Sequence, residues 1–194
     1  MKKLFYLVTI LALLLPCSAS ALEEKEIGPV MREKVDIVLE ILNDQNRTKA
    51  EQNAAIEKEM DPYFDFTLMA KLSLGKEGWT SATPAQRKEY VRLFERRIKD
   101  SYMNKIDLYK DEEIHLDAPK QANKRILLNS YIIEKGEKKE VLYKYYHSKK
   151  HGWLIYDVDV LGVSIIQSYR SQFSSELEKG SMEQLLQKLR EPLP

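Results

Sequence analysis

The residue types that most often carry catalysis or metal binding are few in this sequence and poorly arranged for either task. His147 and His151 are four positions apart, but the lysines and glycine of residues 149–152 mark a hairpin tip. The helical spacing of a zinc-binding histidine pair does not apply there. His115 stands alone. We therefore interpret the three histidines as solvated or hydrogen-bonded side chains.

Acidic and hydroxyl side chains near Gly162 are the next candidates for chemistry. Asp157 and Asp159 point to the same side of a predicted strand, as two catalytic carboxylates could. Acids at the end of a strand also serve as capping or hydrogen-bonding groups, and we favour that interpretation. Ser164 lacks the second glycine of the G-x-S-x-G nucleophile motif, and no glycine cluster resembles a phosphate loop. An enzyme would need Asp157 together with a tyrosine.

The first 21 residues have the pattern of a secretory signal peptide. Two lysines precede an apolar run over residues 4–15, and the small-residue sequence Ala-Ser-Ala ends at Ala21. We expect cleavage after Ala21, and Pro16 argues against a lipoprotein anchor at Cys17. The apolar run is shorter than the ~20 residues that span a bilayer. The sequence therefore predicts a soluble, exported protein.

The remaining chain, 22–194, is predicted to form a single domain. It carries 29 of the 31 basic residues, all 30 acidic residues and no cysteine. A net charge near zero argues against a nucleic-acid partner, because phosphate binding needs a concentrated basic surface. The lack of cysteine excludes disulfides, thiol catalysis and cysteine-ligated zinc from this region. The length suits one hydrophobic core.

Hydrophobic periodicity predicts helices first, then strands, then helices. The first helices are expected over about 29–42, 48–60, 64–74 and 83–109, with capping boxes at Thr48 and Thr83. Strands joined by short, antiparallel loops are expected over 113–116, 124–134, 140–147 and 153–160. Two last helices are expected over 163–178 and 181–189. This order defines an α+β fold in which helices wrap over a four-stranded antiparallel sheet.

The inward-facing stripes of these elements are rich in tyrosine, of which the sequence contains 11. Each buried tyrosine hydroxyl needs a hydrogen-bond partner or water. Tyrosines therefore suit the wall of a cavity with a wet mouth. They also suit positions that straddle core and surface, and the residues alone leave both interpretations open.

Short motifs along nearly the whole chain carry a family resemblance. They are Phe64-Asp65-Phe66, Met69-Ala70, Leu74-Gly75, Trp79, the helix from Thr83 to Tyr102, and the segment from Trp153 to Phe173 with Gly162-Val163-Ser164 and Tyr169-Arg170-Ser171-Gln172-Phe173. Together with the signal peptide, they resemble the MlaC or toluene-tolerance family, the soluble periplasmic component of the Mla phospholipid transport system. The chain differs from that pattern in its richness in lysine and tyrosine.

The resemblance implies a fold similar to the nuclear-transport-factor or cystatin type, with a lipid between the helices and a curved sheet. It implies a phospholipid carrier that maintains outer-membrane lipid asymmetry, and neither an enzyme nor a metal protein; the lipid is cargo and no cofactor is expected. Its partners would be an outer-membrane lipoprotein–porin complex and an inner-membrane ABC transporter with an MCE-domain subunit. We expect a monomer.

The predicted acyl-chain site consists of residues on the inward stripes, in a pocket at or above the ~1,000 Å³ upper end of ordinary ligand sites. These residues are Phe66, Met69, Phe94, Ile98, Tyr102, Ile106, Leu128, Tyr143, Tyr145, Val163, Ile166 and Tyr169. One alternative is a periplasmic domain of the same type with another apolar ligand or a weak cavity-based enzyme activity. Another is a purely protein-binding domain without a cavity.

Overall fold

The structure, a computed structural model, describes residues 21–106 and 112–193, and the side chains of all these except 102–106. The predicted signal peptide lies outside this part of the chain apart from Ala21. Within the described residues, no helix combines the length and the hydropathy needed to cross a bilayer.

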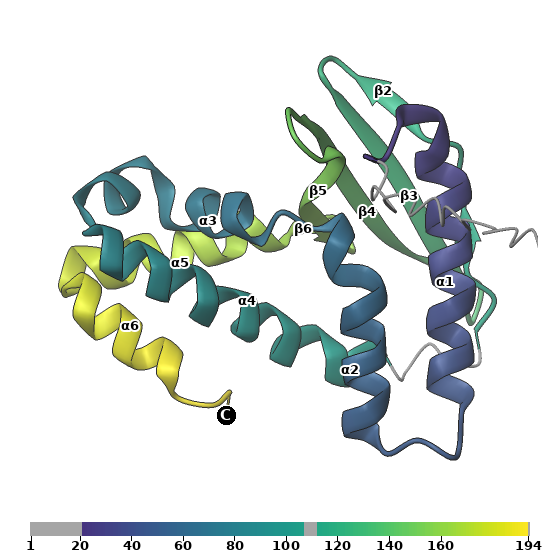
Figure 1. The fold of residues 1–194 in the computed structure, drawn as a ribbon, viewed down its shortest axis with the longest axis horizontal. Coiled ribbons are helices and arrows are strands. Elements are labelled where there is room, and N and C mark those ends of the chain that lie inside the picture. Colours follow the sequence, from purple (N-terminus) through teal and green to yellow (C-terminus); the bar gives the residue numbers. More distant parts are fainter. Residues whose placement is uncertain (1–20, 107–111, 194) are drawn as a thin grey trace, which may run out of the picture.

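The helices lie close to where hydrophobic periodicity predicts them (Figure 1). They are α1 (Ile27–Asn43), α2 (Lys49–Met60), α3 (Phe66–Ser81), α4 (Pro84–Ile106), α5 (Ile165–Lys179) and α6 (Met182–Arg190), with short 3-10 turns at Glu24–Glu26 and Asp61–Tyr63. The capping boxes are confirmed: the Thr48 hydroxyl accepts from the Glu51 amide at 3.3 Å, and the Thr83 hydroxyl accepts from the Gln86 amide at 3.2 Å.

The sheet contains six antiparallel strands, so the prediction of four was wrong. They are β1 (His115–Leu116), β2 (Lys120–Ala122), β3 (Arg125–Glu134), β4 (Glu137–Ser148), β5 (Gly152–Val160) and β6 (Val163–Ser164). Their order is β1-β3-β4-β5-β6, and β2 pairs with β3 beside β1. The two additional strands, β2 and β6, are too short to produce an alternating pattern in the sequence.

The turn between β5 and β6 corrects the predicted start of α5. Leu161 and Gly162 have φ angles of 51° and 80°, which form a two-residue hairpin turn and place Val163 in a strand. The helix begins at Ile165, because the Ser164 hydroxyl accepts a hydrogen bond from the Gln167 amide at 3.0 Å and caps it.

Helix α3 does not end at Gly75, where the sequence predicts its end. Gly75 adopts φ 74° and ψ 170°, which kinks the helix without stopping it, and helical structure resumes as far as Ser81. Glycine tolerates this conformation because it has no Cβ. A glycine that would be interpreted as a stop signal is therefore a bend inside the element.

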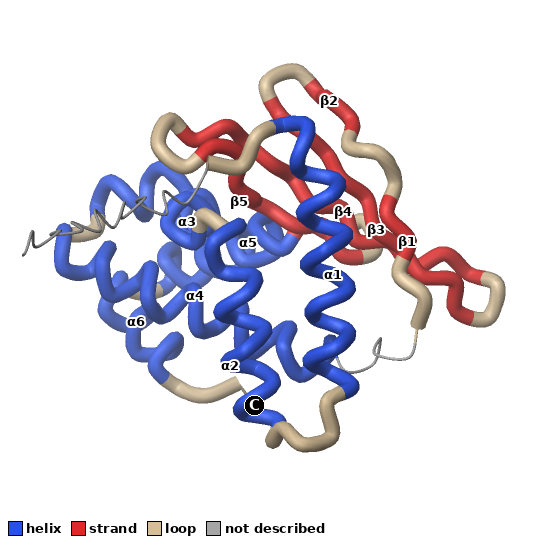
Figure 2. Tube along the Cα trace, turned by 45° about the vertical axis from the view of Figure 1, so that its right-hand side comes forward, coloured by secondary structure: helices blue, strands red, loops and turns tan. Residues whose placement is uncertain are grey.

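The helices form two groups on one side of the sheet, as Figures 1 and 2 show. Helix α1 lies along β3 and β4 with α2 beside it in the α1–α2 hairpin, while α3, α4, α5 and α6 pack together as the second group. The main core lies among the second group and the sheet, with Tyr90, Leu93 and Phe94 of α4 fully buried. The hairpin has a small hydrophobic cluster of its own, Val38, Ile41, Leu42 and Ile56.

Both ends of the described chain are held against distant elements. The Leu22 carbonyl accepts from the Trp153 amide at 3.0 Å, beside Gly152 at the start of β5. At the other end, Arg97 donates to the carbonyls of Lys188 and Glu191 at 2.9 and 2.8 Å, and the neighbouring Arg96 also donates to the end of α6. These two arginines therefore fasten the end of α6 to α4.

Candidate functional site

A cavity of about 540 Å³ separates the α1–α2 hairpin from the sheet and from the main core. Its walls come from α1, α2, the starts of α3 and α5, the middle of α4, and the inward faces of β3, β4 and β5. A cavity between helices and sheet is what the family resemblance implies. The volume is within the ordinary range of about 300–1,000 Å³ for ligand sites and below the volume that we expected.

The α1 wall follows directly from helical periodicity. Met31, Val35, Val38 and Leu42 recur at steps of four, three and four, so they share one face of the helix, and all line the cavity. On the opposite side, alternate residues of the strands, such as Tyr143 and Val158, supply the wall. The lining is therefore mainly apolar, with aliphatic side chains facing the sheet.

The predicted site residues divide into two groups. Those that line the cavity are Phe66, Met69, Ile98, Tyr143 and Val163. Those that pack in or against the main core without lining the cavity are Phe94, Leu128, Tyr145, Ile166 and Tyr169. The side chains of Tyr102 and Ile106 lie outside the described residues. Sequence reasoning missed the α1 and α2 walls, although the apolar stripe of α1 was recognised as a helix face.

Aromatic packing explains why part of the second group stays away from the cavity. The rings of Phe94 and Tyr169 meet edge-on at 5.3 Å, and Tyr169 stacks on Phe173 at 5.3 Å. The Tyr169 hydroxyl also lies 3.1 Å from the Ser101 hydroxyl. These contacts join α4 to α5 and use the inward face of α5 for the core.

Two nearly buried lysines line the cavity on the helical side. Lys99 of α4 is 16% exposed, and its ammonium group lies 2.6, 2.8 and 3.2 Å from the carboxylates of Asp61, Glu95 and Glu57. Burial lowers the pKa of Lys99, but these acidic partners outweigh burial and raise it above its usual value of 10.5. The cluster links α4 to α2 and to the turn that follows α2.

The second lysine forms an ion pair between the two helices of the hairpin. Lys34 of α1 is 13% exposed and pairs with Glu59 of α2 at 2.8 Å. The hydrogen bond to Glu59 is the main cause that raises the pKa of Lys34. Both lysines are therefore charged and paired with carboxylates at neutral pH, so each brings a neutralised polar group to an otherwise apolar wall.

The mouth of the cavity is marked by the lining residues that remain exposed. They are Glu140, Leu161, Val163 and Ser168, and they gather around the β5–β6 turn and the start of α5. The Leu161 amide donates to the Glu140 carbonyl at 2.9 Å, which ties the β5–β6 turn to β4. Exposed leucine and valine side chains here give the cavity an apolar rim.

Asp157, the strongest candidate for enzymatic chemistry, is a structural group outside the cavity wall. Its carboxylate accepts from the Ser164 hydroxyl at 2.8 Å, from the Ile166 amide at 3.2 Å and from Lys144 at 3.0 Å. These bonds fasten β4 and the start of α5 to β5. Within the described chain, no group of three or more histidine, cysteine or acidic side chains is placed to hold a metal ion.

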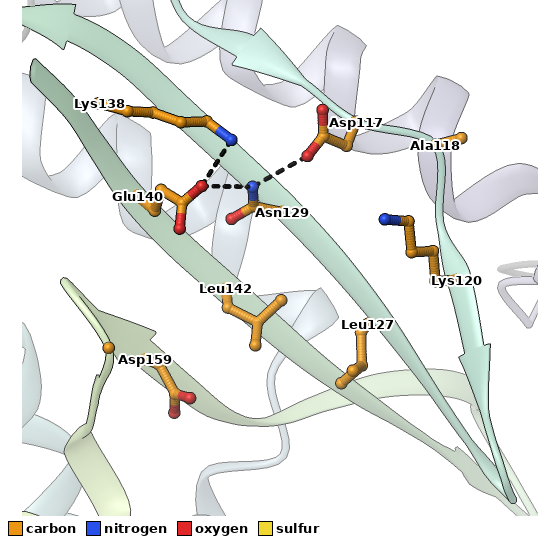
Figure 3. A pocket seen from close by; sticks show the side chains of 10 residues that line it. Asp117, Ala118, Lys120, Leu127, Asn129, Lys138, Glu140, Leu142 and Asp159 are labelled. Atoms are coloured by element: carbon orange, nitrogen blue, oxygen red, sulfur yellow. Dashed lines mark hydrogen bonds and ion pairs between the residues drawn. The ribbon is translucent and has the colours of Figure 1, made fainter.

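A second hollow, of about 390 Å³, lies on the opposite face of the sheet (Figure 3). Leu127 and Asn129 of β3 line it, and they alternate along the strand with residues that face the helices. Asn129 donates to Asp117 at 2.9 Å, and Lys138 pairs with Glu140 at 2.5 Å. Four of its polar lining residues thus bond to one another on the outer face of the sheet.

Comparison with known proteins places this fold in a family. The model of the MlaC protein family matches residues 32–191. The chain belongs to the MlaC family. The family assignment confirms the resemblance that the sequence motifs indicate.

Two relatives illustrate the MlaC family. The intermembrane phospholipid transport system binding protein MlaC of Haemophilus influenzae is 22% identical, over 98% of this chain and 93% of its own length. A solved structure, the phospholipid-binding protein of Ralstonia solanacearum in complex with a phospholipid, superposes with a TM-score of 0.72 at 20% identity. The superposition covers 84% of this chain and 93% of that one, and it confirms the predicted α+β fold.

Proposed function

We propose that this protein is a periplasmic phospholipid carrier that shuttles lipid between the outer and inner membranes. The observation that carries the proposal is the mainly apolar cavity of about 540 Å³ beneath the α1–α2 hairpin, in a chain of the MlaC family. The named relatives, an intermembrane transport binding protein and a phospholipid complex, support it. The cargo is a phospholipid, and the protein performs no chemistry on it.

The need for such a carrier follows from the cost of exposing acyl chains to water. At ~0.8 kcal/mol per CH₂ group, a diacyl lipid with about 30 chain carbons costs on the order of 20 kcal/mol to expose. An apolar wall such as Met31, Val35 and Val158 removes that cost without any catalytic group. We propose that the acyl chains lie against this wall, with Phe66, Met69, Ile98 and Tyr143, and that the headgroup stays near the exposed mouth.

The partners and the location belong to the same proposal. The carrier would lose a signal peptide near Ala21 and act as a soluble monomer in the periplasm. It would exchange lipid with an outer-membrane lipoprotein–porin complex and with an inner-membrane ABC transporter that contains an MCE-domain subunit. Differences in lipid affinity between the carrier and its partners would set the direction of transport.

Mass spectrometry tests the proposal directly. The protein is purified from cells in its mature form, its native mass is measured, and organic extracts are analysed for lipid. We expect one phospholipid per protein and loss of that mass after extraction. A protein that is empty and takes up no lipid from phosphatidylethanolamine and phosphatidylglycerol vesicles would refute the proposal.

A matched pair of substitutions on α1 tests which face holds the lipid. Val35→Trp adds bulk to the cavity wall, whereas Val30 is partly buried on the same helix but does not line the cavity. We expect Val35→Trp to weaken lipid binding about tenfold, equivalent to about 1.4 kcal/mol, and Val30→Trp to leave it near the wild-type value. Equal lipid occupancy in both variants would remove α1 from the proposed wall.

A further inference from the structure

Two tight turns of the sheet share the same unusual backbone geometry. The β3–β4 turn, Lys135-Gly136, has φ angles of 51° and 82°, and the β5–β6 turn, Leu161-Gly162, has φ angles of 51° and 80°. Two-residue hairpin turns with positive φ at both positions strongly favour asparagine, aspartate or glycine at the first position. A leucine there is disfavoured because its side chain crowds the left-handed backbone.

A leucine at position 161 is unfavourable for a second, independent reason, which is the exposure of its apolar side chain to water. Its side chain is 59% exposed, and that of Val163, on the other side of the turn, is 61% exposed. The Leu161 backbone is already anchored to β4 through the Glu140 carbonyl, and an asparagine would keep that bond. The fold alone therefore gives no reason for a large apolar side chain at this corner. Local strain of this kind often accompanies a functional role.

The position of the turn indicates what that role is. Leu161 and Val163 both line the cavity and both face solvent, so they bridge its apolar interior and the outside. Charges at the neighbouring β3–β4 tip are largely paired with each other, as in Lys138–Glu140 at 2.5 Å and Lys139–Glu137 at 2.7 Å. The β3–β4 tip thus offers no excess of basic groups to attract a lipid headgroup, and the distinctive property of the mouth is its exposed hydrocarbon.

We propose that Leu161 and Val163 form a portal over which the acyl chains of the cargo pass between the cavity and the outside. This inference rests on the proposed carrier function and adds the route that the lipid takes. An acyl chain that passes over this portal contacts the leucine and valine side chains on its way between the cavity and the outside. These contacts replace part of its exposure to water. Because the portal contacts the chain mainly during passage, it lowers the barrier to uptake and to release equally.

Rate measurements on full mature protein test the portal. Uptake and release of a fluorescent phosphatidylethanolamine are followed by stopped-flow mixing with phosphatidylcholine vesicles. For Leu161→Asn we expect both rates to fall about tenfold, with the equilibrium between vesicle and protein unchanged. The same variant should melt about 2–4 °C higher, because asparagine relieves the left-handed backbone.

Lys135→Asn is the matched control, since it changes the equivalent position of the twin turn. It should raise the melting temperature by a similar amount and leave both rates unchanged. Wild-type rates in Leu161→Asn would overturn the portal. Faster release with lower occupancy would also overturn it, because that result would make Leu161 part of the resting wall.

A second variant keeps the portal falsifiable if Leu161→Asn unfolds at a lower temperature than expected. Val163→Thr keeps the β-branched shape that suits the short strand β6 and replaces one exposed methyl group with a hydroxyl. It should also slow uptake and release, by about fourfold at most because one methyl group is involved, and unchanged rates would refute the portal. Wild-type protein that binds no lipid would instead refute the carrier function itself, which separates the two failures.

Discussion

Replacing Lys99 with methionine should loosen the connection between the α1–α2 hairpin and the rest of the molecule. The ammonium group bridges Glu95 on its own helix to Glu57 of α2 and Asp61 of the following turn, over 2.6–3.2 Å. The carboxylates are partly exposed, so each pair contributes about 0.2–1 kcal/mol. Loss of three pairs, and of the cation that separates three negative charges, should lower the free energy of unfolding by about 2 kcal/mol.

Thermal unfolding followed by circular dichroism measures this effect. For a chain of this size, about 2 kcal/mol corresponds to a melting temperature about 4–8 °C lower. The pKa of Lys99 is raised, so its contribution is complete below pH 10.5 and is lost as the pH rises beyond that value. The difference between wild type and Lys99→Met should therefore be constant between about pH 7 and 9 and shrink in stronger alkali.

Lys34→Met is the control, because Lys34 is equally buried and lines the same cavity but pairs with Glu59 inside the hairpin. It should cost about 1 kcal/mol or less and leave the hairpin attached to α4. Lys99→Met should also exchange lipid faster than Lys34→Met. Equal stability and equal exchange in the two variants would refute the conclusion that the Lys99 cluster holds the hairpin to the core.

Three further predictions follow from local geometry. Gly152→Ala should lower the free energy of unfolding by about 2 kcal/mol in thermal melts. The φ angle of Gly152 is 70°, and the added Cβ would lie 2.4 Å from a backbone oxygen. Gly136→Ala is the control and should cost less, because Gly136 has a φ of 82° but open space around it. Arg97→Ala should speed proteolysis at the end of α6 and just beyond it, where Arg97 binds one carbonyl on each side of the helix end, without changing circular dichroism. Burial, and then the neighbouring Asp65 carboxylate, raise the pKa of Tyr146 to about 12. The free energy of unfolding should therefore fall as the pH rises from about 10 towards 12, and this fall should be less steep in Tyr146→Phe.

Local signals in the sequence predicted most of the helices and strands. The Thr48 and Thr83 capping boxes locate helix starts because their partners are three residues away. Alternation along β3 marks a strand, but it left open which face of the sheet is turned towards the helices. Such signals depend on neighbours along the chain, and for that reason they can be read without a structure.

Local signals do not show what a buried face meets. Tyr143 and Tyr145 lie two residues apart on the same side of β4, yet Tyr143 lines the cavity and Tyr145 is buried in the main core. The alternation of side chains along a strand places both tyrosines on the same face, whichever environment each of them meets. The apolar stripe of α1 likewise predicts a buried face, but whether that face meets side chains or empty volume depends on how far the hairpin stands from the sheet.

Long-range polar contacts were equally inaccessible from the sequence. Arg96 and Arg97 bond to carbonyls more than 90 positions away along the chain, and backbone acceptors have no sequence signature. The volume of the cavity was overestimated for a related reason. It was inferred from the size of the expected ligand, whereas the actual space depends on side chains of α1 and β5 that meet only in the folded protein.

The docking of Leu22 on Trp153, together with the placement of α1 opposite β3 to β5, limits the order in which the chain can assemble. Everything on the hairpin side of the cavity is synthesised early, and everything on the sheet side is synthesised late. Local helices can form at once, but their apolar faces have no sheet to cover them until β5 exists. A newly made chain therefore exposes the surfaces that later line the cavity through most of its synthesis and needs protection from aggregation during that interval.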